Sequence, residues 1–426
     1  MGIEADHPLR GVLMQELHSR MAMPVKAPVE VFQATYLCTP AEGSACAGRL
    51  LTVLDALPSP QAEAPRYGVI ATAIAGRPAQ VKWEHHTEFL SVSVAITGAH
   101  GEETRLAVET LLDGVFGPLG ARRLAAVNVQ VEQAEGQPDP VALAARFPTG
   151  SCAGAVVNGG EAWVALDFHI DGDGYSRALI QNRGLTDDRL GRLVQRILEI
   201  ETYRAAAFLA FPQARETMAI LTDMERRLED TVGRIRDSKT PAEDRAILDS
   251  LTDLAVDLGH LVTRNRWRFG ASLAYGEIVS ERLDELREDR IPGLQRVGLF
   301  LKRRLRPGIR TVEAAARLQG ELAAGMERAQ ASLRTRVDVG LSSQSATLLT
   351  SLDRNSSMHV RIQEAVEALS IVGITYYLVS LVEKVMHGLP ETEGWPSTSR
   401  IVAIAVPVCA GVVAIAARWL RRNVPH

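Results

Sequence analysis

Cysteine, lysine and aromatic residues are all scarce in this chain of 426 residues. Its four cysteines, Cys38, Cys46, Cys152 and Cys409, lack the spacing of a metal site and are too few for a disulfide scaffold. Aromatic residues make up only 5% of the sequence. Lysine and arginine total 47 against 51 aspartates and glutamates, a net charge of −4, so we exclude a broadly basic nucleic-acid-binding protein.

Familiar catalytic motifs are also missing. The sequence contains no G-x-x-x-x-G-K-[ST], G-x-G-x-x-G, G-x-S-x-G or H-E-x-x-H pattern, so the usual nucleotide-binding, hydrolase and protease signatures are absent. We therefore predict neither an enzyme nor a resident cofactor, with one divalent-metal alternative considered below.

Hydrophobic residues make up 46% of the chain, and many are concentrated near the C-terminus. Residues 368–382 carry no charge, and residues 401–417 form a second uncharged run. A helix over 366–386 spans about 30 Å, the thickness of the hydrocarbon core of a bilayer. We predict transmembrane helices at 365–386 and 401–420, joined by a short external loop at 387–400. The alternative is a buried helical hairpin in a soluble protein.

Charge around these segments predicts their orientation. Arg418, Arg421 and Arg422 follow the second segment, whereas the loop is slightly acidic. The positive-inside rule then places the tail, 421–426, in the cytoplasm. Two spans return the N-terminal part to the same side, and residues 1–20 contain no apolar core of a signal peptide. We predict a multi-pass protein of a bacterial inner membrane with both termini cytoplasmic.

The secondary-structure pattern of the remaining sequence changes near Gly184. Residues 1–184 alternate strand-like and helix-like segments, with a hairpin signal at Asn158-Gly159-Gly160, and predict a cytoplasmic α+β domain of about six strands. Helical periodicity dominates afterwards. It predicts a helical domain over 185–307 and a long, coiled-coil-like stalk helix over 308–364, with helix breaks at Phe211-Pro212, Lys239–Pro241, Ile291-Pro292-Gly293 and Arg306-Pro307-Gly308.

An apolar stripe follows the predicted stalk helix into the first membrane segment. A single helix cannot bury such a stripe by itself, so we expect it to contact neighbouring helices or further subunits. The predicted partners are therefore the lipid bilayer and other copies of the chain, in a homo-oligomer. The stripe consists of Leu322, Met326, Ala329, Leu333, Val337, Leu341, Leu348, Leu352, His359, Ile362, Val366 and Leu369.

Five segments carry a family resemblance. They are residues 7–20, 82–89, 167–177, 191–204 and 274–279. They resemble motifs of a bacterial family of uncharacterised membrane-anchored proteins, defined only as a domain of unknown function. That resemblance implies membrane anchoring and supplies no activity. The sequence departs from the family at Met21, where proline is usual, and at His85, where arginine is usual.

The order of segments is also similar to that of CorA-type metal-ion channels. In both, a cytoplasmic α/β domain precedes a long helix, two C-terminal membrane helices and a short external loop. CorA-type channels carry a Gly-Met-Asn signature after the first membrane helix. Here the corresponding stretch, 382–389, contains no such triplet, so magnesium selectivity of that kind is not expected.

Polar residues along the first membrane helix suggest pore-facing positions. Glu367, Ser370, Tyr377 and Ser380 fall near one face and could line a conduit in a closed oligomer. The simpler interpretation places Glu367 at the membrane interface and packs the serines against the second helix.

A second candidate site lies in the N-terminal domain. Glu84, His86 and Glu88 alternate along a strand-like segment, and their side chains suit a divalent metal such as zinc or manganese. Alternating polar residues are more often the solvated face of a sheet. A change of apolar phase after Trp83 and Phe89 also indicates a bulge or a strand break.

Two functions follow from these observations. The first is a membrane-anchored, oligomeric interaction or sensing module of unknown activity. The second is a CorA-like oligomeric ion channel or transporter without the Gly-Met-Asn signature. The sequence does not identify the small molecule or ion that either would bind.

Overall fold

The computed structural model describes residues 7, 9–11, 14, 22–56, 65–98, 101–388 and 398–423. Contacts divide the chain into two compact units. One unit comprises Met1–Arg236 and Asp249–Ala329, and the other comprises Asp237–Leu248 and Gln330–His426. The first is a mixed α+β unit, which confirms the α+β class expected for the N-terminal part of the chain.

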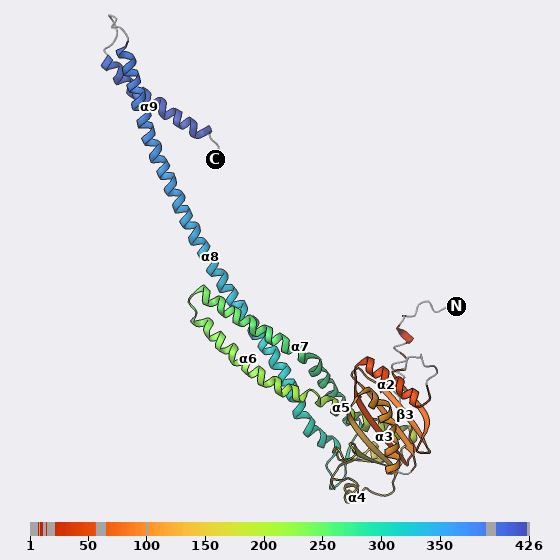
Figure 1. Cartoon of the computed structure of the whole chain (residues 1–426). Coiled ribbons are helices and arrows are strands. Elements are labelled where there is room, and N and C mark those ends of the chain that lie inside the picture. Colours follow the sequence, from red (N-terminus) through yellow and green to blue (C-terminus); the bar gives the residue numbers. More distant parts are fainter. Residues whose placement is uncertain are drawn as a thin grey trace. The chain divides into compact units, whose positions relative to one another are not determined.

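The described strands form one nine-stranded sheet with β1 near its centre (Figure 1). Its order is β2-β3-β4-β1-β5-β8-β7-β6-β9, and β5 and β8 are its one parallel pair among the described strands. The strands are β1 (Val29–Leu37), β2 (Tyr67–Ile74), β3 (Arg77–His85), β4 (Phe89–Thr97), β5 (Arg122–Gln133), β6 (Ala153–Val157), β7 (Ala162–Leu166), β8 (Ser176–Asn182) and β9 (Asp289–Arg290).

This sheet is larger than the sequence predicts. The strand-like segment that contains Glu84, His86 and Glu88 is divided between β3 and β4, which pair antiparallel on either side of a turn at 86–88. The phase change after Trp83 therefore marks a strand break. The predicted hairpin at Asn158 is present, because the short η2 turn (Asn158–Gly160) joins β6 to β7, and all three of its residues have positive φ.

Helices cover both faces of the sheet. The described helices are α2 (Pro40–Val53), α3 (Glu102–Phe116), η1 (Gly117–Leu119), α4 (Pro140–Ala144), α5 (Asp187–Phe208), α6 (Phe211–Asp237), α7 (Pro241–Glu285), α8 (Val297–His387) and α9 (Thr398–Asn423). One core joins the sheet to α2 and α3 through residues such as Phe32, Leu50 and Leu112. A second core joins the opposite face to α5, α7 and α8 through Val31, Ile197 and Leu301.

The sequence of β1 explains why it is buried on both faces. Phe32, Ala34 and Tyr36 alternate toward the core that contains α2 and α3, as the two-residue period of a strand requires. Val29 and Val31 belong to the other core. On that second face the apolar pattern stops after Val31, where Gln33 and Thr35 follow, yet both polar residues are buried.

Helix α8 corrects one predicted boundary. The sequence suggests a break at Pro307-Gly308, but α8 begins at Val297 and continues through Pro307. Gly308 packs so closely against Phe208 that a Cβ there would lie 2.7 Å from the ring. Tertiary contact therefore offsets the backbone hydrogen bond that proline removes. The predicted breaks near Pro212, Pro241 and Pro292 do separate helices.

Two of the described helices are long and apolar enough to cross a membrane. They are α8 and the segment Ser399–Trp419 of α9. The most apolar stretch of α8 has no residue buried in the chain, and that of α9 has 6% of its residues buried. Leu369, Val372 and Tyr377 are 75%, 68% and 76% exposed. The predicted loop residues 389–397 lie outside the described residues, as do the last three residues of the tail.

Gly191 provides a test of the contact between α5 and the segment that precedes β1. A Cβ at Gly191 would lie 2.0 Å from the carbonyl oxygen of Met23, which is backbone and cannot rotate away. We expect Gly191→Ala to lower the free energy of unfolding by about 3 kcal/mol or more, the upper range for overpacking. Urea unfolding monitored by tryptophan fluorescence measures the change.

The matched control is Gly320→Ala, also in a helix of the same unit, where an added Cβ meets nothing within 4 Å. Alanine there should stabilise by about 0.5–1 kcal/mol, because glycine is the poorer helix former. Equal effects at the two positions would contradict the close approach at Gly191.

Candidate functional site

Two rows of buried polar residues cross three neighbouring strands of the sheet. Strand register places Thr35 opposite Ser91, and Ser91 opposite Glu84. The next row, two residues along, is Gln33, Ser93 and Lys82. Because successive side chains on a strand alternate between faces, both rows lie on the same face of β1, β4 and β3.

Helix α5 covers these rows with polar side chains of its own. Gln195, Glu199 and Thr202 are spaced four and three residues apart, which places them on one helix face. Thr202 Oγ1 accepts a hydrogen bond from Gln33 Nε2 at 2.7 Å and lies 3.1 Å from Thr35 Oγ1. Thr35 and Ser91 are also joined, at 3.1 Å between their hydroxyl oxygens. The polar face of the sheet is therefore matched by a polar face of the helix.

Lys82 is the most deeply buried charge in this group. Its side chain is 2% exposed, and its ammonium nitrogen lies 3.1 Å from Glu84 Oε1. It also donates to Gln195 Oε1 at 3.0 Å. An isolated ammonium group at this depth would be strongly disfavoured, so Glu84 and Gln195 are what allow Lys82 to remain in the interior.

A cavity of about 160 Å³ lies between the polar rows and the helices. That volume is enough for several water molecules or one small polar ligand. Lys82 pairs with Glu84 beside the cavity, and Arg282 of α7 pairs with Glu199. The site therefore offers balanced charge together with hydroxyl and amide groups. The cavity is lined by Gln33, Glu84, His86, Ser91, Gln195, Glu199, Thr202, Tyr203 and Arg282.

Aromatic rings gather beside the cavity. Tyr203 of α5 and Tyr275 of α7 stack at 5.5 Å between ring centroids, and Phe89 lies 6.0 Å from each of them. His86 lies 4.4 Å from the Phe89 ring. Burial raises the pKa of Tyr275, as does the neighbouring Glu88 carboxylate, so its hydroxyl stays protonated at neutral pH.

Of the three predicted metal ligands, Glu84 and His86 line the small cavity and Glu88 does not. Glu84 is at the end of β3 and pairs with Lys82, whereas His86 and Glu88 belong to the turn before β4. Glu88 pairs with Arg268 of α7 at 2.6 Å. The three are therefore not on one face of a single strand, which corrects that expectation. No group of three His, Cys, Asp or Glu side chains in the described ranges is placed to hold a metal ion, and the metal prediction gains no support.

The predicted pore-facing residues all lie on α8, in the unit that contains Gln330–His426. Ser370 and Tyr377 are exposed, whereas Glu367 and Ser380 are half-buried. The Ser370 hydroxyl donates to the Val366 carbonyl at 2.8 Å, which satisfies it inside its own helix. A pore role for these four residues stays a prediction.

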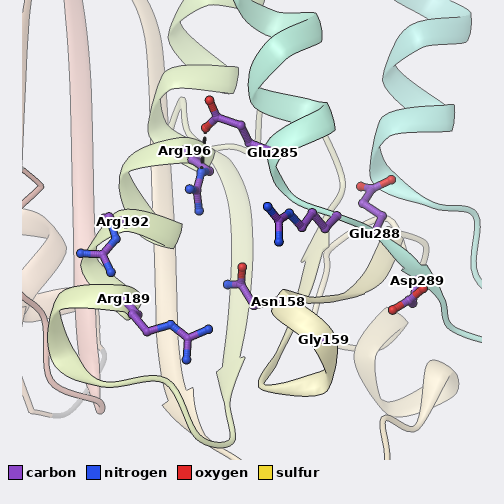
Figure 2. A pocket seen from close by; sticks show the side chains of 9 residues that line it. Asn158, Gly159, Arg189, Arg192, Arg196, Glu285, Glu288 and Asp289 are labelled. Carbon is purple, nitrogen blue, oxygen red and sulfur yellow. Dashed lines mark hydrogen bonds and ion pairs between the residues drawn. The ribbon is translucent and has the colours of Figure 1, made fainter.

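A larger, open cavity lies beside the N-terminal half of α5. Its volume is about 720 Å³. Figure 2 shows Arg189, Arg192 and Arg196 on successive turns of α5, with Asn158 of the β6–β7 turn and the carboxylates of Glu285, Glu288 and Asp289 on neighbouring segments. Arg287 and Gly159 complete the lining.

A continuous series of ion pairs and hydrogen bonds joins the two cavities. Arg196 donates to Glu285 Oε2 at 2.9 Å, and Arg282 donates to Glu285 Oε1 at 2.9 Å. Arg282 also pairs with Glu199, to which Gln195 donates at 2.9 Å. Gln195 in turn contacts Lys82. The order from the open to the buried end is Arg196, Glu285, Arg282, Glu199, Gln195 and Lys82.

Four residues of this series lie in two segments that carry the family resemblance, Lys82 in 82–89 and Gln195, Arg196 and Glu199 in 191–204. The model of a family described as Protein of unknown function (DUF3422) matches residues 5–424, nearly the whole chain. The chain belongs to the DUF3422 family. A comparison with curated proteins finds no match. Membership in DUF3422 does not show the likeness to CorA-type channels that the order of segments suggests.

Sequence reasoning missed most of the buried site. It singled out Glu84 and His86, but not Lys82, Gln195, Glu199 or Arg282 as functional. A usable signal was present in β1 and β4, where Gln33 and Thr35, and likewise Ser91 and Ser93, recur two residues apart within otherwise apolar strands. The partner residues on α5 and α7 are far away in the sequence, so only the fold brings them together.

Lys82→Met tests the role of the buried ion pair. Methionine nearly retains the volume but leaves the Glu84 carboxylate, which is 14% exposed, without its ammonium partner. We expect the free energy of unfolding to fall by about 3–5 kcal/mol, as when one partner of a buried pair is removed. Urea unfolding of the full chain in detergent provides the measurement.

Lys302→Met is the matched control, because Lys302 pairs with Asp284 on the surface, with side-chain exposures of 45% and 69%. An exposed pair contributes about 0–1 kcal/mol, so the control should remain close to the unmodified protein. If both lysine variants lost the same stability, the buried pair would have no special role.

Proposed function

We propose that the chain is a membrane-anchored interaction or sensing module. In this proposal the α+β unit lies in the cytoplasm and the apolar parts of α8 and α9 form a transmembrane hairpin in a bacterial inner membrane. The observation that carries the proposal is that the most apolar stretches of both helices have almost no burial within the chain, 0% and 6% of their residues. A soluble helical hairpin would bury such stretches in its own core.

Exposed residues along α8 support this interpretation. Leu369, Val372, Ile374, Tyr377 and Leu381 are all more than half exposed. An apolar surface of this length is unfavourable in water and favourable in hydrocarbon. The helix backbone satisfies its own hydrogen bonds, and the hydroxyls of Ser370 and Thr375 also bond to backbone carbonyls within α8. These are the conditions that a segment must meet to cross a bilayer.

The orientation follows from arginines at the end of α9. Arg418 is exposed, and Arg421 and Arg422 follow it in the sequence. Under the positive-inside rule they place the C-terminal end in the cytoplasm. With two spans, the N-terminal unit lies on the same side. Because no observation favours conduction, the anchor is the function that we propose, without a channel.

Membrane attachment and orientation are testable in cells. We expect the full chain to remain in the membrane fraction after alkaline carbonate extraction. Val372→Arg combined with Val408→Arg should release a large part of it, because each arginine at a span centre costs about 2.5–3.5 kcal/mol. Both valines are exposed, at 68% and 57%. Val339→Arg, on the same helix but outside the apolar stretch, is the control and should leave extraction unchanged.

A reporter measures orientation in the same experiment. Alkaline phosphatase, which is active only in the periplasm, should be active when fused after His387 and inactive when fused after Asn423. Phosphatase activity of the fusion after Asn423 would refute the proposed orientation. Release of the unmodified chain from the membrane fraction by carbonate would refute the anchor itself.

We also propose that copies of the chain associate through α8. Leu348, Leu352, Ile362 and Val366 are 65%, 63%, 52% and 58% exposed and recur near one helix face. Copies anchored in one membrane share an orientation, so equivalent stripes can pair in parallel register. A parallel coiled coil buries such a stripe with knobs-into-holes contacts.

Paired charge substitutions test the association. Leu348→Asp with Leu352→Asp should convert the detergent-solubilised oligomer to a monomer in multi-angle light scattering. Thr350→Asp with Ser357→Asp places the same charges on the opposite face and should leave the mass unchanged. Both control residues are exposed. A monomeric unmodified chain would exclude the proposal.

A further inference from the structure

Four arginines line the open cavity of about 720 Å³ beside α5. Arg189, Arg192 and Arg196 recur at three- and four-residue steps, so they occupy one side of the helix (Figure 2). Arg287 reaches the cavity from the connection that follows α7. Three of the four are exposed, and only Arg196 is half-buried. The cavity is therefore open to a ligand from solution.

Two of the four arginines are already neutralised by carboxylates. Arg189 forms an ion pair with Glu161, and Arg196 pairs with Glu285 at 2.9 Å. By contrast, the guanidinium groups of Arg192 and Arg287 have neither an ion pair nor a hydrogen bond within the part of the chain that the structure describes. They leave up to ten N–H donors available at one cavity.

The carboxylates that line the cavity are mostly engaged elsewhere. Glu285 accepts hydrogen bonds from both Arg196 and Arg282. Glu288 accepts the backbone N–H of Gly298, in the first turn of α8, at 2.9 Å, and burial raises the pKa of its carboxyl group. Of the lining carboxylates, Asp289 alone has no such partner among the described residues. The lining thus carries four arginines against three carboxylates, and Arg192 and Arg287 are the two arginines that no carboxylate neutralises among the described residues.

The backbone conformation of Arg287 separately explains why its side chain lies at the cavity. Arg287 has a φ of +50°, in the left-handed region that non-glycine residues rarely adopt. The backbone N–H of Arg287 donates to the backbone carbonyl of Asp284 at 3.2 Å, and β9 begins two residues later, so the connection is fixed on both sides. This geometry places the Arg287 side chain at the cavity.

We propose that this cavity binds a small polyanion with at least two charged oxygen-bearing groups, such as a diphosphate. Guanidinium groups match phosphate and carboxylate oxygens in a planar, two-point geometry, and several together favour a multiply charged ligand over a single carboxylate. The Asn158 side chain adds an amide donor on the facing turn. A volume of about 720 Å³ exceeds what one phosphate fills and lies within the usual range of small-molecule sites. The site deepens the proposed sensing role, and it does not require membrane attachment.

Calorimetric titration of the full chain in detergent tests the site, with sodium pyrophosphate as the probe. We expect saturable binding that weakens as salt rises. Arg192→Gln and Arg287→Gln should each weaken it by about tenfold or more, since each removes a hydrogen-bonding cation. Because both side chains are exposed, the variants should keep the melting temperature of the unmodified protein.

Arg303→Gln is the matched control. Arg303 is an exposed arginine of α8 in the same unit that does not line the cavity, so its loss should leave the affinity unchanged. No binding by the unmodified chain, or binding that both cavity variants retain, overturns the site. Carbonate extraction is measured separately, so loss of anion binding with an intact anchor distinguishes this proposal from the previous one.

Two further titrations identify the source of the anion. Citrate supplies carboxylates in place of phosphates, and a soluble short-chain phosphatidic acid supplies a lipid headgroup. Preference for pyrophosphate over both indicates a free phosphate ligand, whereas preference for the phosphatidic acid indicates a headgroup. In each case the cavity variants must lose the binding for the site to hold.

Discussion

The ammonium group of Lys82 is placed in the interior, and much of the α+β unit is arranged around that charge. Glu84, two residues along the same strand, supplies the opposite charge, and Gln195 supplies an acceptor that reaches Lys82 because α5 covers β3 at this point. Gln33 and Thr35 of β1 then provide hydrogen-bonding partners for the same helix face, and the serines of β4 bond to these two residues in turn. Burying a cation costs free energy, so its retention with two partners, one of them on α5, implies a fixed position for α5.

The broad features of the fold could be predicted because they depend on local sequence. Apolar periodicity and prolines located the helices of the C-terminal half, and the Asn158-Gly159-Gly160 turn located a hairpin. Prediction failed where distant contacts decide the local structure. Pro307 lies inside α8 because Gly308 packs against Phe208, and Phe208 is a hundred residues away. That contact has no signature within a short window of sequence.

The candidate site was harder to predict than the fold for a related reason. Glu84 and His86 attracted attention as metal ligands because of their chemistry, although their ion-pair and ring partners come from other elements. In the sequence alone, the arginines of α5 are typical of an ordinary solvent-exposed helix face. What distinguishes Arg192 from Arg196 is whether a carboxylate faces it, and Glu285 reaches Arg196 from the end of α7. Such pairing depends on tertiary structure alone.

The polar rows also act on the choice between correct and incorrect strand pairings. A shift of β1 by one residue would turn Gln33 and Thr35 toward the apolar core of α2 and α3, and would turn Phe32 and Ala34 toward Thr202 and Gln195. Both exchanges would leave polar groups without hydrogen-bonding partners. The residues that form the cavity therefore make misaligned strand pairings less stable than the native one. A substitution that made this face fully apolar would remove that difference and favour misfolding, even where it left the native structure intact.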